Sequence, residues 1–417
     1  MTYKSESAIG GAATGSHHAR LKKVDSTTGG RPAIAVFDHH VVATNPVGSR
    51  TLAMLSALAD VCDFTVFAIS FDNPRPDRIR HVPVRTPRRP LVLQYGAFHA
   101  AATLRYVAER LRRRRPFDFV LSADTVVLFA DLYYIHFCNR AFLGMAPCPI
   151  RRDSLMGCLH WANHAVQARV EPLVFRRARS VIAVSQGLAR ELNAVFPDTS
   201  GKTTVIHNRI DVRHLHRPDR FDRSAFRADL GLSDRDTVLL FVAHGHFDRK
   251  GLPILLEAHR HLADPRVVVL VVGGTEQGLR PYRLLASDPT MGRVLFMGSC
   301  SDVRPYFWAS DAFVFPSYYE SFSLVSLEAA AAGLPVIAPL LHGIEEYLAD
   351  GVDGFVVEQS LASVAAGIRR FMALTPEERR SMSRAAQRIA ATFDLADIDL
   401  LWYGALQEWM HTRPAVS

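Results

Sequence analysis

The residues from 306 to 339 combine apolar runs with a helical pattern, and their order restricts the fold more than any other part of the chain. Residues 311–315 and 334–338 are short apolar runs, typical of strands buried on both faces of a parallel sheet. Between them, residues 323–332 carry leucines and alanines at helical spacing. A strand, a helix and a second strand in this order predict an α/β fold with a parallel sheet.

The start of this helix is a predicted anion site. Ser323 belongs to the residue types that commonly cap helices, so we expect it to be the N-cap. The amides of Ser323, Leu324 and Val325 would then lie at the positive end of the helix, just beyond the carboxyl end of a strand. Open α/β sheets bind phosphates at this position, so we expect an anion there.

Two carboxylates flank the predicted phosphate site. Glu320 lies in the loop before the helix, and Glu328 lies eight residues further on, in the second turn. Carboxylates repel phosphate but accept hydrogen bonds from sugar and ribose hydroxyls. A nucleotide that carries a sugar would satisfy both residues. The simpler alternative is that Glu320 caps the helix and Glu328 is an ordinary surface glutamate.

The whole pattern resembles the E-x7-E signature of a large family of retaining glycosyltransferases, glycosyltransferase family 4 or glycosyl transferases group 1. The resemblance extends to the strand at 294–298, the Ala-Ser-Asp step at 309–311, and the turns at 342–346 and 350–355. It implies the GT-B fold, an α/β architecture of two doubly wound Rossmann-like domains that face each other across a cleft. It also implies transfer of a sugar from a UDP- or GDP-sugar to an acceptor hydroxyl with retention of configuration.

The resemblance assigns roles to particular residues. Arg249 and Lys250, at a predicted strand-to-helix turn, resemble the basic pair that holds the donor diphosphate, although the arginine that the family usually has just after this strand is missing. Glu320 is expected to contact the donor sugar, and Glu328 the ribose. His136 resembles a histidine that faces the sugar from the other domain, and a buried core histidine is the simpler alternative.

Two glycines complete the predicted site. Gly273, with the glycine after it, ends a predicted strand in a turn where backbone can approach a nucleotide. In the resembling family the first loop carries a glycine pair beside the donor phosphates and the acceptor, and here only Gly48 is present. The triplet at 234–236 has the form D-x-D, but it merely precedes a predicted strand, so we interpret it as a solvated turn. We expect no metal and no cofactor other than the nucleotide sugar.

The chain of 417 residues, 48% of them hydrophobic, is too long for one ordinary core. Its expected parts are a disordered tail at 1–30, an acceptor-binding domain at 31–212, a donor-binding domain at 213–394, and a final helix at 395–417 that crosses back to the first domain. Near the boundary, Arg209 replaces the glycine that the resembling family usually has, which leaves open how the hinge turns.

The net charge of +8 is unevenly distributed. Residues 1–215 carry 29 lysines and arginines against 16 acidic residues, whereas the remainder carries 20 against 25. Such a field suits an anionic membrane or a lipid-linked acceptor. Arginines concentrate at 75–89, an expected irregular loop, and at 110–115, the expected end of a helix. Because no aromatic residues accompany them, nucleic acid is not an expected partner.

No apolar run reaches the length that a membrane-spanning helix needs, so the sequence predicts a cytoplasmic protein, peripheral on the membrane at most. Other functions remain open at this stage. An epimerase could use the same fold without an acceptor, and a non-catalytic protein could bind a sugar nucleotide at a membrane. A dinucleotide-dependent oxidoreductase is disfavoured because no G-x-G-x-x-G follows the first predicted strand.

Overall fold

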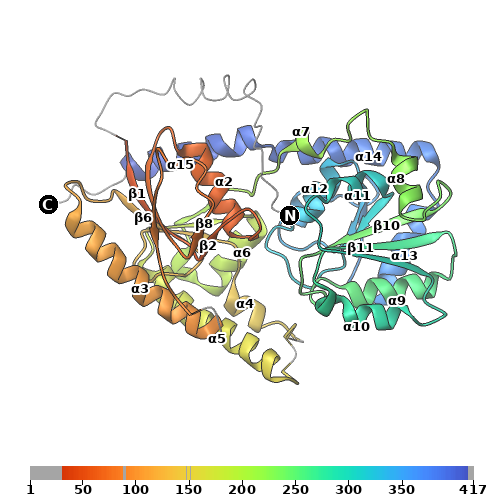
Figure 1. Cartoon of the computed structure of the whole chain (residues 1–417), viewed down its shortest axis with the longest axis horizontal. Helices are drawn as coiled ribbons and strands as arrows, with labels where there is room; N and C mark the ends of the chain where they lie inside the picture. The colour runs from red at the N-terminus through yellow and green to blue at the C-terminus, as the bar shows by residue number, and fades with distance from the viewer. Residues whose placement is uncertain (1–30, 88–90, 147, 151, 412–417) are drawn as a thin grey trace, which may run out of the picture.

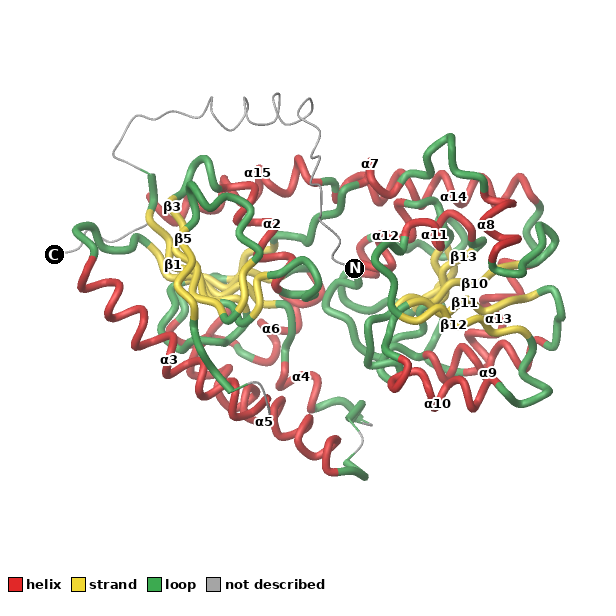
Figure 2. Tube along the Cα trace, in the orientation of Figure 1, coloured by secondary structure: helices red, strands yellow, loops and turns green. Residues whose placement is uncertain are grey.

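The computed structural model describes residues 31–87, 91–146, 148–150 and 152–411. They form two lobes, each built on a parallel sheet with helices on both faces (Figures 1 and 2). The first lobe is the part around the sheet of β1 to β9, and the second is the part around the sheet of β10 to β15. The tail expected at 1–30 lies outside the described residues.

The first lobe contains a seven-stranded sheet in the order β5-β3-β1-β6-β7-β8-β9, parallel throughout. Its strands are β1 (Ala33–Phe37), β3 (Asp63–Ala68), β5 (Arg80–Pro83), β6 (Phe119–Ala123), β7 (Leu132–Ile135), β8 (Ser180–Ala183) and β9 (Thr203–Val205). Its helices are α2 (Gly48–Leu58), α3 (Leu91–Arg112), α4 (Asn139–Leu143), α5 (Leu155–Arg177), α6 (Gln186–Val195) and η1 (Pro197–Thr199). A small ladder pairs β2 (His40–Val41) with β4 (Ser70–Phe71).

The second lobe contains a six-stranded sheet in the order β12-β11-β10-β13-β14-β15, with parallel neighbours. Its strands are β10 (Thr237–Val242), β11 (Val267–Val272), β12 (Arg293–Gly298), β13 (Ala312–Val314), β14 (Val336–Ala338) and β15 (Gly354–Val356). Its helices are α8 (Arg223–Asp229), α9 (Leu252–Leu262), α10 (Glu276–Ala286), α11 (Arg304–Ala309), α12 (Leu324–Ala331), η2 (Ile344–Glu346), α13 (Leu361–Met372) and α14 (Pro376–Ala390). β11 is buried along its whole length, which explains its continuous run of valines and leucine.

Both sheets are doubly wound, and this topology locates the site. In the second lobe the chain proceeds outward from β10 through β11 and β12, then returns to β13 on the other side of β10. In the first lobe β1 and β6 adjoin in the same way. Loops that leave two adjacent strands in opposite directions open a crevice at their carboxyl ends, where α/β sheets bind ligands. The switch points therefore lie at β10/β13 and β1/β6.

The lobes are joined by two chain crossings. α7 (Val212–Leu215) leads from the first lobe into the second, and α15 (Leu395–His411) follows η3 (Ala391–Phe393) back to the first (Figure 1). α15 packs against α2, and the Trp402 ring meets Tyr134 edge-on at 4.9 Å. In addition, Arg179 Nη2 donates to the carbonyl of Trp409 at 2.7 Å.

The prediction of an irregular loop at 75–89 is wrong for four of its residues. Residues 80–83 form β5, which pairs with β3 as the edge strand of the first sheet, whereas residues 88 and 89 lie outside the described residues. Val82 faces inward, while Arg80 and Pro83 are exposed. Arg80 forms an ion pair with the buried Glu109 at 2.9 Å. Proline and a charged side chain are tolerated here because an edge strand presents one side to solvent.

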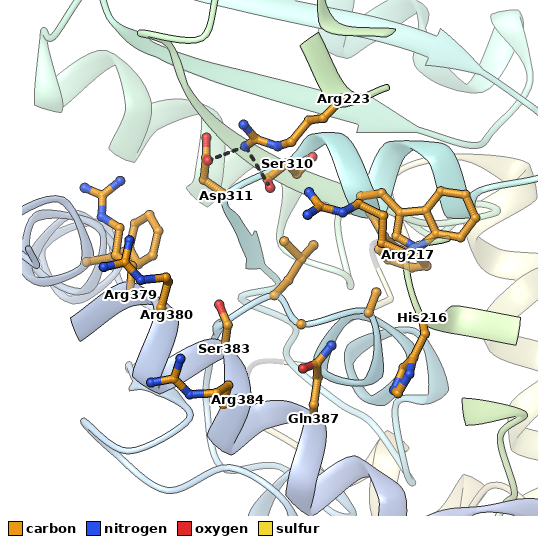
Figure 3. A pocket seen from close by; sticks show the side chains of 16 residues that line it. His216, Arg217, Arg223, Ser310, Asp311, Arg379, Arg380, Ser383, Arg384 and Gln387 are labelled. Carbon is orange, nitrogen blue, oxygen red and sulfur yellow. Dashed lines mark hydrogen bonds and ion pairs between the residues drawn. The ribbon is translucent and has the colours of Figure 1, made fainter. Parts of the chain in front are cut away.

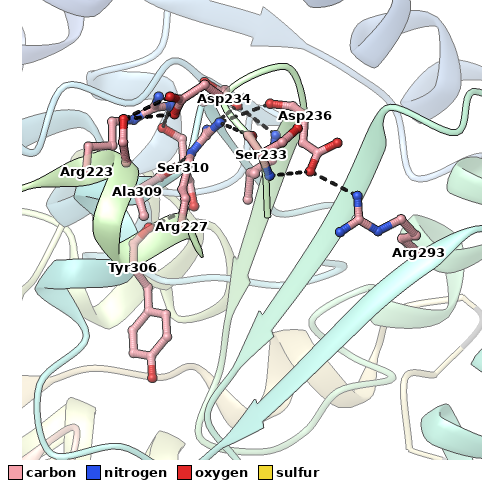
Figure 4. A network of polar contacts seen from close by, with 12 residues as sticks. Arg223, Arg227, Ser233, Asp234, Asp236, Arg293, Tyr306, Ala309 and Ser310 are labelled. Atoms are coloured by element: carbon pink, nitrogen blue, oxygen red, sulfur yellow. Dashed lines mark hydrogen bonds and ion pairs between the residues drawn. The ribbon is translucent and has the colours of Figure 1, made fainter. Parts of the chain in front are cut away.

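The D-x-D triplet lies in a turn, as predicted, with Asp234 and Arg235 exposed, and its carboxylates also make hydrogen bonds. Asp236 accepts hydrogen bonds from Arg293 Nη1 at 2.9 Å and from the amide of Ser233 at 2.8 Å (Figure 4). Asp234 accepts from Ser224 Oγ at 2.9 Å. Both carboxylates therefore serve the fold. Over the described residues, no cluster of three or more His, Cys, Asp or Glu is placed to hold a metal ion.

A buried arginine connects this region to the sheet. Arg227 is 1% exposed and donates to the carbonyls of Ala309 at 2.7 Å, Ser233 at 3.3 Å and Asp236 at 3.1 Å (Figure 4). Its Nη2 also donates to Asp311 at 2.7 Å. Because its donors are paired, the charge is accommodated in the interior.

Candidate active site

Glu320 is a buried carboxylate held by cations. It lies in the loop after β13, is 7% exposed, and accepts hydrogen bonds from Lys250 Nζ at 2.6 Å and Ser317 Oγ at 2.8 Å. Arg249 Nη1 lies 3.7 Å from the same oxygen. Burial alone would raise the pKa of Glu320, but the charges of Lys250 and Arg249 lower it below its ordinary value. Glu320 is therefore a fixed negative charge at neutral pH.

Arg249 and Lys250 come from the turn between β10 and α9, at the switch point. Lys250 Nζ lies 5.0 Å from the centre of the Phe315 ring, and Arg249 Nη1 donates to the carbonyl of Tyr319 at 2.6 Å. Burial lowers the pKa of Lys250 despite the neighbouring carboxylate. Gly251 lets the turn approach the loop after β13, because a Cβ there would lie 2.0 Å from the carbonyl oxygen of Pro316. The structure thus brings Arg249, Lys250 and Glu320 together.

The start of α12 differs from the expected cap. Ser323 precedes the helix, but it has a positive φ of 58° and its side chain makes no capping hydrogen bond. Its hydroxyl instead pairs with Ser326 Oγ at 2.7 Å, and its carbonyl accepts from Tyr347 OH at 2.8 Å. The first-turn amides of Leu324 and Val325 have no acceptor within the helix, as at any helix start. The predicted helix start is therefore present, but the hydrogen bond by which the Ser323 side chain would cap it is absent.

Glu328 lies in α12, half-buried, with no hydrogen-bond partner for its carboxylate among the described residues. Burial raises the pKa of Glu328, and the positive charge of Arg50 in the first lobe opposes this shift. Arg50 itself donates to the carbonyl of Arg209 at 3.0 Å. The sequence analysis did not select Arg50. Its position two residues after Gly48, which was itself a predicted site residue, could have pointed to it.

The first lobe contributes His136, which the sequence analysis selected, and two aspartates that it did not select. His136 is 7% exposed, and neither ring nitrogen has a hydrogen-bond partner within the described chain. Its backbone amide donates to Asp124 Oδ1 at 2.7 Å, and its Nδ1 lies 3.7 Å from that oxygen. Asp38 is buried and accepts from Thr51 Oγ1 at 2.7 Å. Burial, and to a lesser extent the charge of Asp124, raises the pKa of Asp38 to about 6.

These aspartates could have been found from their positions. Asp38 directly follows β1 and Asp124 directly follows β6, so both lie at the carboxyl ends of the strands that form the first switch point. What the sequence could not supply was the order of the strands, which makes β1 and β6 neighbours although more than 80 residues separate them.

The two predicted glycines are needed by the backbone. A Cβ on Gly48 would lie 1.6 Å from the carbonyl oxygen of His40, so α2 can start here only without a side chain. Gly273 has a φ of 98°, and a Cβ there would lie 2.3 Å from the carbonyl oxygen of Ala243. Gly48 is the first residue of α2, and Gly273 directly follows β11.

Backbone strain concentrates at the same loops. Among the described non-glycine residues, four have a positive φ: Asp124, His246, Ser323 and Ala263. The first three lie in loops at the carboxyl ends of β6, β10 and β13, where the lobes meet. Strained backbone of this kind persists where the surrounding structure holds it, and it is common at binding and catalytic sites.

Hydrogen bonds between the lobes position the loop that carries Glu320. Glu191 in α6 accepts from Tyr319 OH at 2.7 Å and lies 3.1 Å from His342 Nε2. Ser185 Oγ donates to the carbonyl of Ser321 at 2.7 Å. Both residues adjacent to Glu320 in the chain are thus bound to the first lobe.

Comparisons with known proteins identify the family of the chain. The family described as Glycosyltransferase Family 4 matches residues 47–214, and that described as Glycosyl transferases group 1 matches residues 222–389. D-inositol 3-phosphate glycosyltransferase from Mycobacterium sp. (strain KMS) is 35% identical over 234 residues, which cover 54% of this chain and 51% of the relative. The enzyme of the same name from Mycobacterium tuberculosis (strain F11) is 34% identical over 232 residues, covering 54% and 47%. The match thus spans about half the length of the curated relatives.

Solved structures share the fold. Sucrose-phosphate synthase from Thermosynechococcus elongatus superposes with a TM-score of 0.73 at 21% identity, covering 92% of this chain and 100% of that one. WaaG, a glycosyltransferase involved in lipopolysaccharide biosynthesis, superposes with a TM-score of 0.70 at 17% sequence identity, covering 88% of this chain and 98% of WaaG. Anabaena HepE in complex with UDP-glucose superposes with a TM-score of 0.68 at 20% sequence identity, covering 90% of this chain and 99% of HepE. These likenesses confirm the expected GT-B fold. Since the two family matches together span both lobes, the chain belongs to the glycosyltransferases of family 4, group 1.

Proposed function

We propose that the protein transfers a glycosyl group from a nucleotide-diphosphate sugar, of the UDP or GDP type, to an acceptor hydroxyl with retention at the anomeric carbon. One observation carries the proposal: buried Glu320, bonded to Lys250 and near Arg249, lies just before a helix whose second turn presents Glu328. The cations and helix amides suit the diphosphate of such a donor. The two carboxylates suit the hydroxyl groups of its sugar and its ribose. That HepE was solved with UDP-glucose supports the donor class.

The cations are assigned to the leaving group. A lysine ammonium has three donors, so Lys250 can bind a diphosphate oxygen while it still donates to Glu320. Arg249 and the first amides of α12 add further positive potential where the nucleoside diphosphate departs. Because two fixed cations are available for the developing charge, we propose that the reaction needs no divalent metal.

The carboxylates are assigned to the hydroxyl groups of the donor. Glu328, whose carboxylate has no hydrogen-bond partner among the described residues, accepts from the ribose. Glu320 accepts from the transferred sugar. His136, with neither ring nitrogen hydrogen-bonded within the described chain, contacts that sugar from the first lobe. In this arrangement the acceptor hydroxyl attacks from the same face as the leaving diphosphate, whose oxygen takes the proton.

We further propose that the acceptor is a glycan or a lipid-linked molecule reached at an anionic membrane surface, on its cytoplasmic side. α3 carries an exposed apolar stripe at Leu93, Leu104, Val107 and Leu111, and Leu104 and Leu111 are 72% and 82% exposed. This spacing keeps the four side chains on one side of the helix. Exposed arginines on α3, among them Arg105, accompany the stripe. Apolar residues with flanking cations are typical of helices that lie in a membrane interface.

The arginines at the end of α3 divide into two groups. The helix ends at Arg112, and Arg113 donates to Thr65 Oγ1 at 3.2 Å and lies 4.3 Å from the centre of the Phe117 ring. Arg115 forms an ion pair with Asp118 at 3.1 Å. Arg113 and Arg115 therefore support the fold, and the exposed Arg110, Arg112 and Arg114 are the ones assigned to the membrane. No helix in the described ranges is long and apolar enough to cross a bilayer.

Two experiments test these proposals. Thermal shifts of the purified chain with a panel of nucleotide sugars should identify a donor, and radiolabelled transfer with that donor should proceed in EDTA. A panel without any stabilising nucleotide sugar would contradict the donor assignment. For the membrane, wild type should pellet with anionic vesicles at low salt, and Leu104→Glu should reduce pelleting. The matched control is Leu284→Glu, since Leu284 is 66% exposed on α10 in the second lobe.

A further inference from the structure

A cavity of about 580 Å³ lies in the second lobe, away from the site described above. Ser310 and Asp311, which precede β13, line it, and so do Gly333 and Leu334, which precede β14. In a parallel sheet these positions mark the amino-terminal edge, whereas Glu320 and the donor residues lie at the carboxyl edge. The remaining walls come from α8, α11, α13, α14 and the segment that follows α7.

The lining of this cavity is strongly cationic. Five arginines line it (Arg217, Arg223, Arg379, Arg380 and Arg384) and Asp311 is the one carboxylate in the lining. Asp311 is already neutralised inside the fold, because its two oxygens accept from Arg223 at 2.6 Å and from Arg227 at 2.7 Å. Figure 3 shows the α14 arginines on one side of the hollow, and Arg217 and Arg223 on the other. The cavity therefore has a positive charge with no internal counterion of equal size.

The partners of the α14 arginines leave much of their donor capacity available. Arg380 donates to Glu377 at 2.6 Å, and Arg384 lies 3.7 Å from the same residue, but Glu377 is 71% exposed, so this pairing is weak. Arg379 Nη2 donates to the carbonyl of Met372 at 3.0 Å, while its Nε is buried without a partner.

The other side of the cavity has a similar excess of donors. Arg217 has no hydrogen-bond or ion-pair partner among the described residues. Ser383 and Gln387, also from α14, add a hydroxyl and an amide to the lining. Guanidinium groups gathered in a concave site repel one another, and a bound phosphate relieves this repulsion through bidentate hydrogen bonds.

We propose that this cavity is a second binding site, for a small, multiply charged anion of the phosphate-ester or pyrophosphate class. Its volume lies within the range of small-molecule sites. The concave shape, with cations from α14 facing those before and within α8, suits a compact ligand that several arginines contact at once. This proposal is independent of the donor site, because the two sites lie at opposite edges of the second sheet and share no residue.

Isothermal titration calorimetry of the full chain with inorganic pyrophosphate tests the proposal at low ionic strength. Pyrophosphate is also expected to occupy the donor site, so five proteins are compared: wild type, Lys250→Ala, the double variant Arg217→Ser/Arg384→Gln, Ser383→Glu, and Arg388→Gln. Arg217 and Arg384 are exposed, so their replacement should leave the fold intact. Arg388 is an exposed arginine of α14 outside the cavity lining, which makes Arg388→Gln a matched control.

The expected result is a binding component that persists in Lys250→Ala and Arg388→Gln but weakens at least tenfold in the double variant. Ser383→Glu, which places a carboxylate in the cavity at a single position, should abolish the same component while the melting temperature without ligand stays unchanged. If the double variant and Ser383→Glu both bind pyrophosphate as wild type does, the proposal is wrong. Loss of all binding in Lys250→Ala would also overturn it, because pyrophosphate would then bind at the donor site alone.

Discussion

Replacing Lys250 with alanine tests the donor site most directly. Its ammonium lies 2.6 Å from Glu320 Oε1, and its side chain is 18% exposed. Under the proposed function this ammonium also binds the leaving diphosphate. Removing one preorganised donor from a developing negative charge typically costs about 2.7–4 kcal/mol. Arg249, 3.7 Å from the same carboxylate oxygen, remains and can offset part of the loss. We therefore expect turnover to fall by about one to three orders of magnitude, or about 1–4 kcal/mol.

The substitution should also affect the resting protein, and this effect must be separated from catalysis. Without Lys250, Glu320 keeps Ser317 as a hydrogen-bond donor and Arg249 as a nearby charge, so one buried carboxylate loses its closest cation. Burial then raises the pKa of Glu320 with less opposition. Some loss of thermal stability is expected, and rates are therefore compared well below the melting temperature of the variant.

The assay measures release of nucleoside diphosphate from the donor that gives the largest thermal shift, together with the affinity for that nucleoside diphosphate alone. Arg260→Ala serves as the control, because Arg260 is a cation in α9 whose partner is Glu257 in the same helix. That control should match wild type in both measurements. If Lys250→Ala also retains wild-type turnover and nucleotide affinity, Lys250 does not bind the leaving group and the assignment fails.

Three further predictions address separate parts of the molecule. Glu328→Ala should weaken nucleotide binding about 10- to 100-fold, the value of a hydrogen bond to a charged acceptor; calorimetric affinity equal to wild type would remove the ribose assignment. Burial raises the pKa of Asp38 from 3.8 to about 6, so the folded state keeps a proton between these values and stability falls as pH rises through this range. Relative to Asp38→Asn, the free energy of unfolding of wild type should therefore fall by roughly 3 kcal/mol between pH 3 and pH 8, measured by urea unfolding; an equal pH dependence of the two proteins would contradict the pKa shift. Arg227→Ala should lower the free energy of unfolding by about 3–5 kcal/mol, since Asp311 and three carbonyls lose a buried partner, while Arg235→Ala at the exposed neighbouring turn should change it little.

Much of the second lobe could be predicted because its signals are local. The strand, helix and strand of residues 306–339 follow from apolar runs, and the spacing of Glu320 and Glu328 places both beside one helix start. Ser323 is the N-cap residue, as predicted, but its side chain does not cap the helix, for a reason that lies elsewhere in the chain. Tyr347 OH donates to the carbonyls of Phe322 and Ser323 and so helps to hold a backbone with positive φ, in which the serine side chain does not cap the helix.

The first lobe was harder to predict because its site depends on strand order. β5 was missed since an edge strand needs few inward apolar side chains, and Val82 is the buried one. Asp38 and Asp124 lie in two separate loops and Arg50 lies in α2, so no local pattern connects them. They come together only because β1 pairs with β6, and because Arg50 lies close enough to Glu328 of α12 for its positive charge to act on that carboxylate.

The contacts around Tyr319 indicate how the two walls act together. Its hydroxyl donates to Glu191 in the first lobe, its carbonyl accepts from Arg249, and the next residue is Glu320. Its ring lies 4.9 Å from that of Phe137 in the first lobe. The loop that carries Glu320 is thus bound at once to the first lobe and to Arg249. Under the proposed function, donor binding is linked to the position of the first lobe through this loop, because Tyr319 contacts Arg249 as well as Glu191.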